Sequence, residues 1–274
     1  MKVPMTKIGD VDVSRIICGS NTFFGYSHFS AAKDTWLRRY FDIGRIVEIL
    51  NKCAEYGINC VISGPDERMK EAREELERQT GWHMNWVCTP GMAGWDLHDD
   101  IKRCADWGVE ICAPHTSWTD ARLNIHKQEI EGLEPYLEQI RSLGMATGLS
   151  THRPEVIVVG DAAGYDLDMY IQPLNVIGFL CAVETDWVAR VIQNTAKTVI
   201  CIKPFAAGRV MPEPGLGYVL RNCKSIDAVA MGFMSPEEVE EDVRIGIAIM
   251  EQQKVEIPLT RSRSKRLLEA TPEK

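Results

Sequence analysis

The chain has 274 residues, of which 45% are hydrophobic and 26% are charged, and its formal net charge is −8. This composition is typical of a globular protein, and the negative charge disfavours a nucleic-acid partner, whose phosphates require a basic surface. No apolar run approaches the roughly 20 residues of a membrane span, and the N-terminus has no apolar signal core. We therefore expect no membrane partner and a cytoplasmic location.

The sequence contains nine cysteines and no Cys-x-x-Cys pair. An odd number of cysteines inside apolar segments is typical of reduced, buried thiols. We therefore expect neither disulfides nor a thiol-rich metal centre.

The first residues, 5–13, alternate between polar and apolar types around Gly9 and Asp10, a pattern that predicts a tight β-hairpin. After it, short apolar runs alternate with longer amphipathic stretches. Strands are expected to begin near Arg15, Asn59, Trp86, Glu110, Ala146, Asp168, Thr198 and Asp227. Helices are expected near 42–56, 66–80, 97–107, 126–143, 153–163, 184–196, 213–222 and 236–251.

Strand–helix units in alternation predict the α/β class and, more specifically, a (β/α)8 TIM barrel preceded by the hairpin. Such a barrel needs about 250 residues, so we expect 1–274 to form a single domain that ends in a tail at 258–274. The alternative is an open, doubly wound sheet, whose usual Gly-x-Gly-x-x-Gly fingerprint is missing here. The longest irregular segment, 21–39, follows the first strand and has the length of a loop that covers a ligand.

Several segments occur in the order in which similar segments occur in one known superfamily: 13–23, 57–59, 148–155, 203–208 and 231–235. Through them most of the chain resembles the aldo-keto reductases. The resemblance implies a barrel that reduces carbonyl groups with a nicotinamide cofactor and uses an aspartate, a tyrosine, a lysine and a histidine. The histidine has a match at His115, whereas Ile62 and Pro90 occupy the places of the aspartate and the lysine. No tyrosine occurs between Tyr56 and Tyr136.

The same resemblance implies that Ser150, Thr151 and Gly232 lie near the cofactor if a nicotinamide binds. NAD(H) is then favoured over NADP(H), because Glu237 and Glu238 in the last strand–helix turn repel a 2′-phosphate. No local metal motif is present. A divalent metal stays open only through residues of separate loops, namely His115, His152, Asp66 and Glu184.

Polar residues that follow the strands are the best candidates for the site, because these barrels carry their active sites at the C-terminal ends of the strands. The candidate catalytic residues are His115, as a general acid or base, and Lys203, as a substrate-binding cation or a nucleophile. Strand alternation from Ala113 and Cys201 is expected to aim both at the barrel mouth. Asp120 either orients His115 or caps a helix. The candidate substrate-binding residues are Asn21, His28, Asp66, His152, Gln172, Asn175 and Arg209.

The residues that remain favour an enzyme that has lost the standard reduction residues. The leading hypothesis is an acid–base lyase, isomerase or epimerase that acts on a small hydroxylated carbonyl or sugar-like substrate. Two alternatives stay open: an NAD(P)-dependent oxidoreductase with a different proton donor, and a non-catalytic binding or regulatory barrel. The sequence does not fix the oligomeric state.

Overall fold

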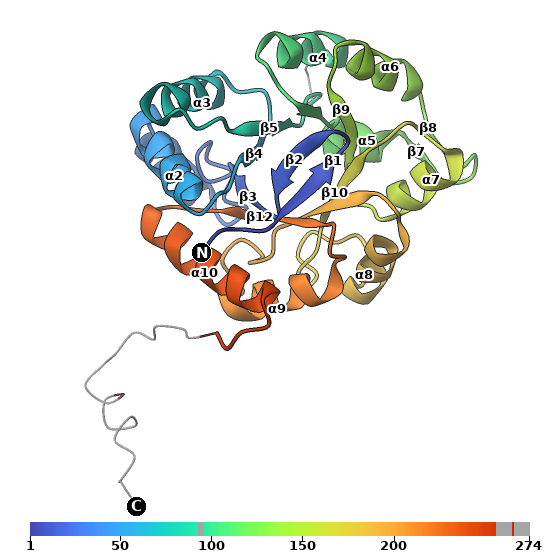
Figure 1. The fold of residues 1–274 in the computed structure, drawn as a ribbon. Coiled ribbons are helices and arrows are strands. Elements are labelled where there is room, and N and C mark those ends of the chain that lie inside the picture. The colour runs from blue at the N-terminus through green and yellow to red at the C-terminus, as the bar shows by residue number, and fades with distance from the viewer. Residues whose placement is uncertain (93–95, 256–264, 266–274) are drawn as a thin grey trace, which may run out of the picture.

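Eight parallel strands close into a barrel in the computed structural model, which describes residues 1–92, 96–255 and 265 (Figure 1). The strands follow chain order around the barrel, and the ring closes where the last strand pairs with the first. They are β3 (Ile16–Gly19), β4 (Cys60–Ser63), β5 (Asn85–Cys88), β6 (Ile111–Cys112), β9 (Ala146–Ser150), β10 (Met169–Pro173), β11 (Thr198–Ile202) and β12 (Ala228–Gly232). The predicted barrel is confirmed, and the open-sheet alternative is wrong. Apart from Lys265, the predicted tail at 258–274 lies outside the described residues.

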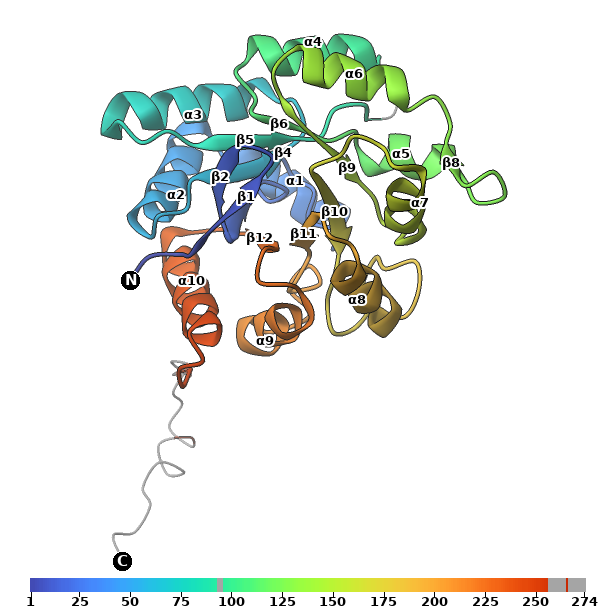
Figure 2. The same ribbon diagram turned by 45° about the vertical axis from the view of Figure 1, so that its right-hand side comes forward.

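Helices form a ring outside the strands, as Figures 1 and 2 show. The covering helices are α2 (Ile43–Glu55), α3 (Glu67–Thr80), α4 (Leu97–Asp106), α6 (Glu134–Ser142), α7 (Glu155–Ala163), α8 (Thr185–Asn194), α9 (Pro212–Asn222) and α10 (Pro236–Met250). Each lies where a helix is predicted. The helix expected over 126–143 is shorter than predicted, because α6 begins only at Glu134.

Three segments differ from the sequence prediction. The segment 21–39, expected to be irregular, contains α1 (Ala31–Tyr40), whose first turn is capped by the Ser30 hydroxyl. The start of the helix expected over 126–143 is instead a hairpin of β7 (Leu123–Asn124) and β8 (Glu129–Ile130). Its turn holds Gln128 at φ 54°, a left-handed conformation that this residue type does not signal. One more short helix, α5 (Thr116–Arg122), lies between β6 and this hairpin.

The N-terminal hairpin lies across the end of the barrel where the strands begin, as Figure 2 shows. Its strands are β1 (Met5–Ile8) and β2 (Val11–Ser14). Ile8 and Val13 are fully buried in the cluster that fills the barrel. The hydroxyl of Thr198, the first residue of β11, donates a hydrogen bond to the Lys7 carbonyl at 3.0 Å. The predicted hairpin is confirmed, and it leaves the opposite end of the barrel open for a site.

Strand alternation separates two hydrophobic layers. On β10 and β11, Ile171 and Ile200 point into the barrel, whereas Tyr170 and Val199 pack against the helices. The Tyr170 hydroxyl donates a hydrogen bond to Asp161 of α7 at 2.9 Å, which shows that the Tyr170 side chain points outward to the helices. All strands run the same way, so the residues that follow them meet at one rim.

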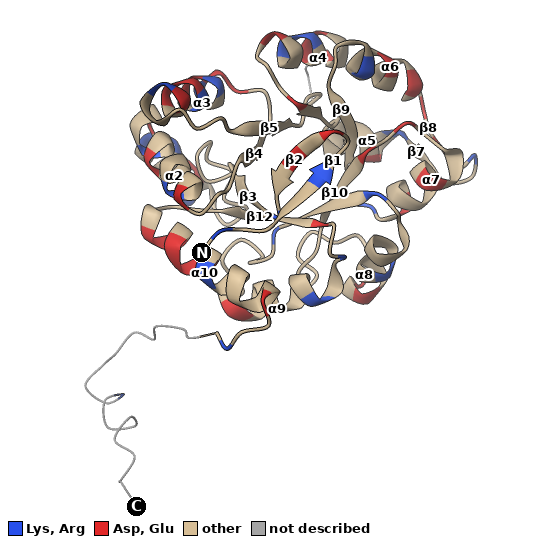
Figure 3. Cartoon of the chain, in the orientation of Figure 1, with Lys and Arg blue, Asp and Glu red and all other residues tan. Residues whose placement is uncertain are grey.

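Charged side chains lie on the helices, the loops and the N-terminal hairpin, and the eight barrel strands carry none (Figure 3). Among the described residues, no helix is both long and apolar enough to span a membrane. All nine cysteines are free thiols, and only Cys181 and Cys223 have part of their surface exposed.

A buried carboxylate joins the first residues of β11 and β12, at the end of the barrel that the hairpin covers. Asp227, fully buried just before β12, accepts hydrogen bonds from the Val199 N–H at 2.8 Å and the Lys224 N–H at 2.6 Å. It also pairs with Lys224 Nζ at 2.8 Å. Replacing it, Asp227→Ala, removes the acceptor of the Val199 and Lys224 N–H groups and leaves Lys224 Nζ with the Ile192 carbonyl alone, so we expect the free energy of unfolding to fall by about 3 kcal/mol in urea denaturation.

The matched control is Asp12→Ala, which removes an exposed ion pair with Lys7. It should change the free energy of unfolding by less than about 0.5 kcal/mol. Equal losses in the two variants would contradict a stabilising role for the buried carboxylate.

Candidate active site

Four basic side chains meet at the mouth of the barrel. His115 follows β6, His152 follows β9 and Lys203 follows β11, while His28 belongs to the segment between β3 and α1. Burial, and then the positive charge of Lys203, lowers the pKa of all three histidines. Together with the nearby His115 and His28, these effects lower the pKa of His152 to about 4. Both candidate catalytic residues and two of the candidate binding residues therefore share one site.

Lys203 reaches this site through an uncommon backbone conformation. On β11, Val199 and Cys201 point toward the helices, where Cys201 contacts Cys223 at the end of α9. Regular alternation would aim Lys203 the same way, so the alternation argument is wrong for this residue. Its φ of 64° interrupts the alternation, and its Nζ atom lies 3.4 Å from His28 Nε2. Burial lowers the pKa of Lys203 to about 8, which makes a neutral amine available near neutrality.

His115 presents a proton to the mouth. Ile111 and Ala113 belong to the cluster inside the barrel, and from them alternation aims His115 the same way. Its Nδ1 atom accepts the Ser117 N–H at 3.2 Å and lies 2.8 Å from the Ser117 hydroxyl. Because a backbone N–H can only donate, Nδ1 is the acceptor and Nε2 carries the proton of the neutral ring. Ser117 is not among the candidates from the sequence. Its place two residues after His115 is the local signal that could have indicated this contact.

His28 has the opposite arrangement. Its Nε2 atom lies 3.4 Å from Asn21 Nδ2 and 3.4 Å from Lys203 Nζ. Both neighbours are donors, so Nε2 accepts and the ring proton sits on Nδ1. The residue has φ 52°, so His28 and Lys203 are both left-handed. Two such conformations in contact are typical of a site whose geometry is imposed by the surrounding structure.

Asp120 ties two elements of the mouth together. Its carboxylate accepts hydrogen bonds from the Thr116 hydroxyl at 2.8 Å, from the Thr151 hydroxyl and from the His152 N–H at 3.1 Å. These bonds join α5 to the end of β9. The predicted alternative of a helix cap is wrong, because His115 caps α5. Asp120 positions His152, and its charge raises the pKa of His115 against the effects of burial and of Lys203.

Several other candidates have local partners. Asp66 caps α3 by accepting the Arg68 N–H at 2.9 Å. Asn175 is fully buried and exchanges two hydrogen bonds with the backbone of Phe179. Gln172 is fully buried on the helix-facing side of β10, where its Oε1 atom has no partner. None of these three contacts the four basic side chains directly among the described interactions.

Arg209 borders the mouth. Its guanidinium lies 4.6 Å from the centre of the Phe179 ring and 5.4 Å from that of Phe29, and it donates to the His28 carbonyl at 3.4 Å. The sequence gives no local signal for this pair of aromatic contacts, because the three residues come from different loops.

The floor of the mouth is apolar. Ile62 and Ile202 are partly buried and pack on the cluster inside the barrel. Ile62 occupies the place where the resemblance implies an aspartate. A ligand above this floor therefore meets methyl groups on one side and the basic side chains on the other.

The turn that follows β12 does not fit the phosphates of a dinucleotide. Ser235 caps α10 by accepting the Glu238 N–H at 3.3 Å, and Glu238 in turn accepts the Met234 N–H at 2.7 Å. This capping box uses N–H groups that a phosphate would need, and it places a carboxylate beside them. Glu237 adds a second acidic group in the first turn. Gly232, the end of β12, is exposed, and the Thr151 hydroxyl is already bonded to Asp120.

A metal centre is not supported either. Within 1–92, 96–255 and 265, no group of three or more His, Cys, Asp or Glu side chains is arranged to hold a metal ion. The candidates from separate loops therefore do not converge as ligands.

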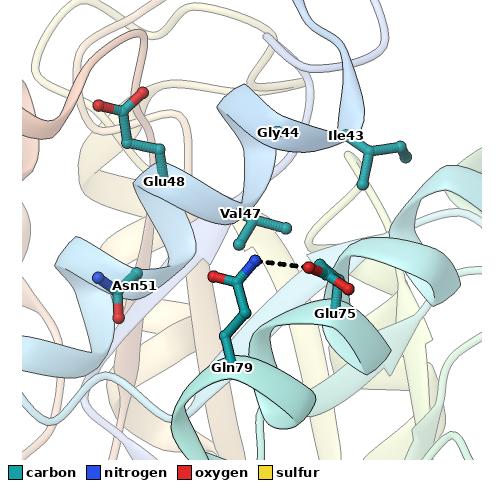
Figure 4. Close-up of a pocket in the computed structure, with 7 residues that line it drawn as sticks. All are labelled: Ile43, Gly44, Val47, Glu48, Asn51, Glu75 and Gln79. Carbon is teal, nitrogen blue, oxygen red and sulfur yellow. Dashed lines mark hydrogen bonds between the residues drawn. The ribbon is translucent and has the colours of Figure 1, made fainter.

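A hollow of about 430 Å³ lies elsewhere, on the outer surface between α2 and α3 (Figure 4). In it, Gln79 donates a hydrogen bond to Glu75 at 2.5 Å. The hollow is lined by Ile43, Gly44, Val47, Glu48, Asn51, Glu75 and Gln79. It contains none of the basic residues of the mouth, so the convergence of titratable groups, rather than the depth of a surface hollow, locates the candidate site.

No protein-family model matches the chain, and no curated protein matches its sequence. Solved structures do match. A protein of Pseudomonas aeruginosa assigned as an aldo-keto reductase has a TM-score of 0.65 at 18% identity, with 90% of this chain and 96% of that chain covered. The chain has the fold of the aldo-keto reductases.

Two further structures support this assignment of the fold. The glycerol dehydrogenase of Gluconobacter oxydans has a TM-score of 0.60 at 11% identity and covers 94% of this chain and 99% of its own. The protein Gox0644, solved as a variant in complex with NADPH, has a TM-score of 0.61 at 12% identity, with 92% and 94% covered. These structural matches confirm the predicted resemblance for the fold. Because the sequence identities are low, the chemistry has to be argued from the residues of this chain.

Removing the charge of Lys203, in Lys203→Met, is expected to raise the pKa of His28, His115 and His152 together. The values should approach the ordinary histidine value of about 6.5 without reaching it, because burial persists. NMR titration of the histidine rings measures the change. The control is Lys197→Met, whose ammonium pairs with Asp161 on the helix layer and should leave the three histidines unmoved. Unchanged pKa values in the Lys203 variant would contradict the shared site.

Proposed function

We propose that this protein is an enzyme that moves protons on the carbon beside a carbonyl group. It acts as a lyase, isomerase or epimerase on a small hydroxylated carbonyl or sugar-like compound. The observation that carries the proposal is the meeting of a desolvated amine, Lys203, with a proton-donating imidazole, His115, at one barrel mouth. The apolar floor at Ile62 and Ile202 supports it, since it offers no carboxylate to neutralise the amine.

Each group has one role in this chemistry. The Nε2–H of His115 donates a hydrogen bond to the carbonyl oxygen, which makes the neighbouring C–H more acidic. The neutral amine of Lys203 is the basic group that this C–H requires, and the enediolate that forms is stabilised by the same imidazole. Return of the proton to the adjacent carbon gives an isomer, return to the other face gives an epimer, and loss of a β-hydroxyl gives an elimination product.

The activity should increase with pH through the titration of Lys203. Its pKa is lowered to about 8 by burial, so the neutral amine, which is the active form, is the minor form at pH 7 and becomes the major form above pH 8. His115 has a pKa below its ordinary value and stays neutral over this range. We expect kcat/KM to be half-maximal at about pH 8 and to level off above it. A profile that falls over this interval would contradict the role of the amine.

Exchange of carbon-bound hydrogen tests the proposal without a known product. The protein is incubated in D₂O with a panel of hydroxylated aldehydes and ketones from trioses to hexoses, and NMR follows the loss of the α-hydrogen signal. We expect exchange with at least one compound, and a decrease of about 10²- to 10⁴-fold in Lys203→Met and in His115→Ala. Lys197→Met is the control and should retain full exchange. Absence of exchange across the panel would favour a non-catalytic binding barrel.

A second candidate, a nicotinamide-dependent oxidoreductase with a different proton donor, is favoured by one observation: a structure of the same fold was solved with NADPH. The acidic capping box of α10 argues against it in this chain. Thermal-shift titration with NADH and NADPH separates the two candidates, because a ligand of the native state raises the melting temperature. We expect no saturable shift with either dinucleotide. Stabilisation by one of them would revive the oxidoreductase.

A further inference from the structure

We infer that Lys203 is a nucleophile, and that the site holds aldehydes and ketones through an imine on its Nζ atom. The inference rests on the proposed function and changes one role in it: once Nζ is bound in the imine it is no longer the base, and the α-hydrogen of the protonated imine passes to the neutral ring of His28.

The surroundings of Lys203 favour an uncharged amine. Among the described residues, no carboxylate lies in ion-pair contact with its Nζ atom, and its polar contact is with a histidine ring nitrogen. An ammonium group without a counter-charge in a desolvated place loses its proton more easily, which is how lysine nucleophiles are activated in proteins. The alternative role, a cation that binds an acidic group, does not need the neighbouring proton acceptor.

That proton acceptor is His28. Its Nε2 atom accepts at 3.4 Å from Lys203 Nζ, and the Asn21 amide at 3.4 Å holds the ring from another side. Burial, Lys203 and Arg209 lower the pKa of His28 while Asp34 opposes them, so the ring is neutral and able to accept at pH 7. The left-handed backbones of His28 and Lys203 hold this contact in place.

The covalent step balances with the groups at hand. His28 accepts one proton from the ammonium, and the free electron pair of Nζ attacks the carbonyl carbon while the C=O π electrons move to oxygen. The C–N bond forms, the C–O bond breaks, and oxygen leaves as water. Of the three ammonium protons, one stays on the protonated imine and two leave with the water, relayed by His28 and His115. No oxidant, reductant or metal is required.

Reductive trapping tests the inference directly. The wild-type protein is treated at pH 7 with glycolaldehyde or dihydroxyacetone and sodium cyanoborohydride, and peptide mass spectrometry compares the labelling rate of each lysine. The larger fraction of neutral amine, partly offset by lower intrinsic nucleophilicity, predicts that Lys203 is labelled at least about tenfold faster than exposed lysines such as Lys7 and Lys102. Labelling of Lys203 at the rate of the exposed lysines would overturn the inference.

Matched variants separate a chemical role from a structural one. Lys203→Arg keeps the positive charge and should lose the label at this position, whereas Lys197→Arg should leave the labelling of Lys203 unchanged. His28→Asn keeps a residue type that tolerates a left-handed backbone and removes the proton acceptor. Loss of the proton relay should slow the labelling of Lys203 at pH 7 by about tenfold or more, while the labelling of Lys7 and Lys102 stays unchanged. An unchanged rate at Lys203 would contradict the role of His28.

The result also separates this inference from the proposed function. Exchange of α-hydrogen without trapping at Lys203 would leave the acid–base function standing and remove the imine. Trapping at Lys203 without exchange would establish the nucleophile and contradict the proposed reaction.

Discussion

The pairing of β12 with β3 is the constraint on which the site depends. It closes the sheet, so strands that are far apart in the chain end at one rim, and the residues that follow them face one another across a small mouth. The hairpin β1–β2 covers the other end of the barrel, and the interior is filled by aliphatic side chains. The open rim is therefore where polar groups can converge, and His115, His152 and Lys203 each follow a strand that ends there.

Among the described residues, Lys203 has no carboxylate in ion-pair contact, and this decides the chemistry of the rim. The chain as a whole carries a net charge of −8, yet Asp120 is occupied by Thr116, Thr151 and the His152 backbone, and Asp34 accepts from Ser27. Burial lowers the pKa of Lys203 to about 8, and burial together with the charge of Lys203 keeps the three histidines neutral at pH 7. A neutral amine and neutral imidazoles can exchange protons with a carbonyl compound at physiological pH, which a salt-bridged lysine cannot.

The sequence predicted the strands and most covering helices well, because buried parallel strands read as continuous apolar runs. It missed α1, which is polar and buries only Leu37, and it missed β7 and β8, whose turn depends on a left-handed Gln128. For the site, alternation from Ile111 and Ala113 aims His115 at the mouth, whereas Lys203 faces the mouth through a left-handed backbone conformation that alternation does not foresee. Asp66 caps α3, and residue type alone could not distinguish a helix-capping aspartate from one that binds a ligand.

The central claim is that Lys203 is a reactive amine under ordinary conditions, and its titration tests this most directly. Trace labelling with acetic anhydride from pH 6 to pH 11, followed by peptide mass spectrometry, gives the pKa of each lysine from its labelling rate. We predict a midpoint for Lys203 at about 8, well below the value of about 10.4 of an ordinary lysine. A midpoint at the ordinary value would show that the amine is solvated or paired, and it would contradict both its basic and its nucleophilic role.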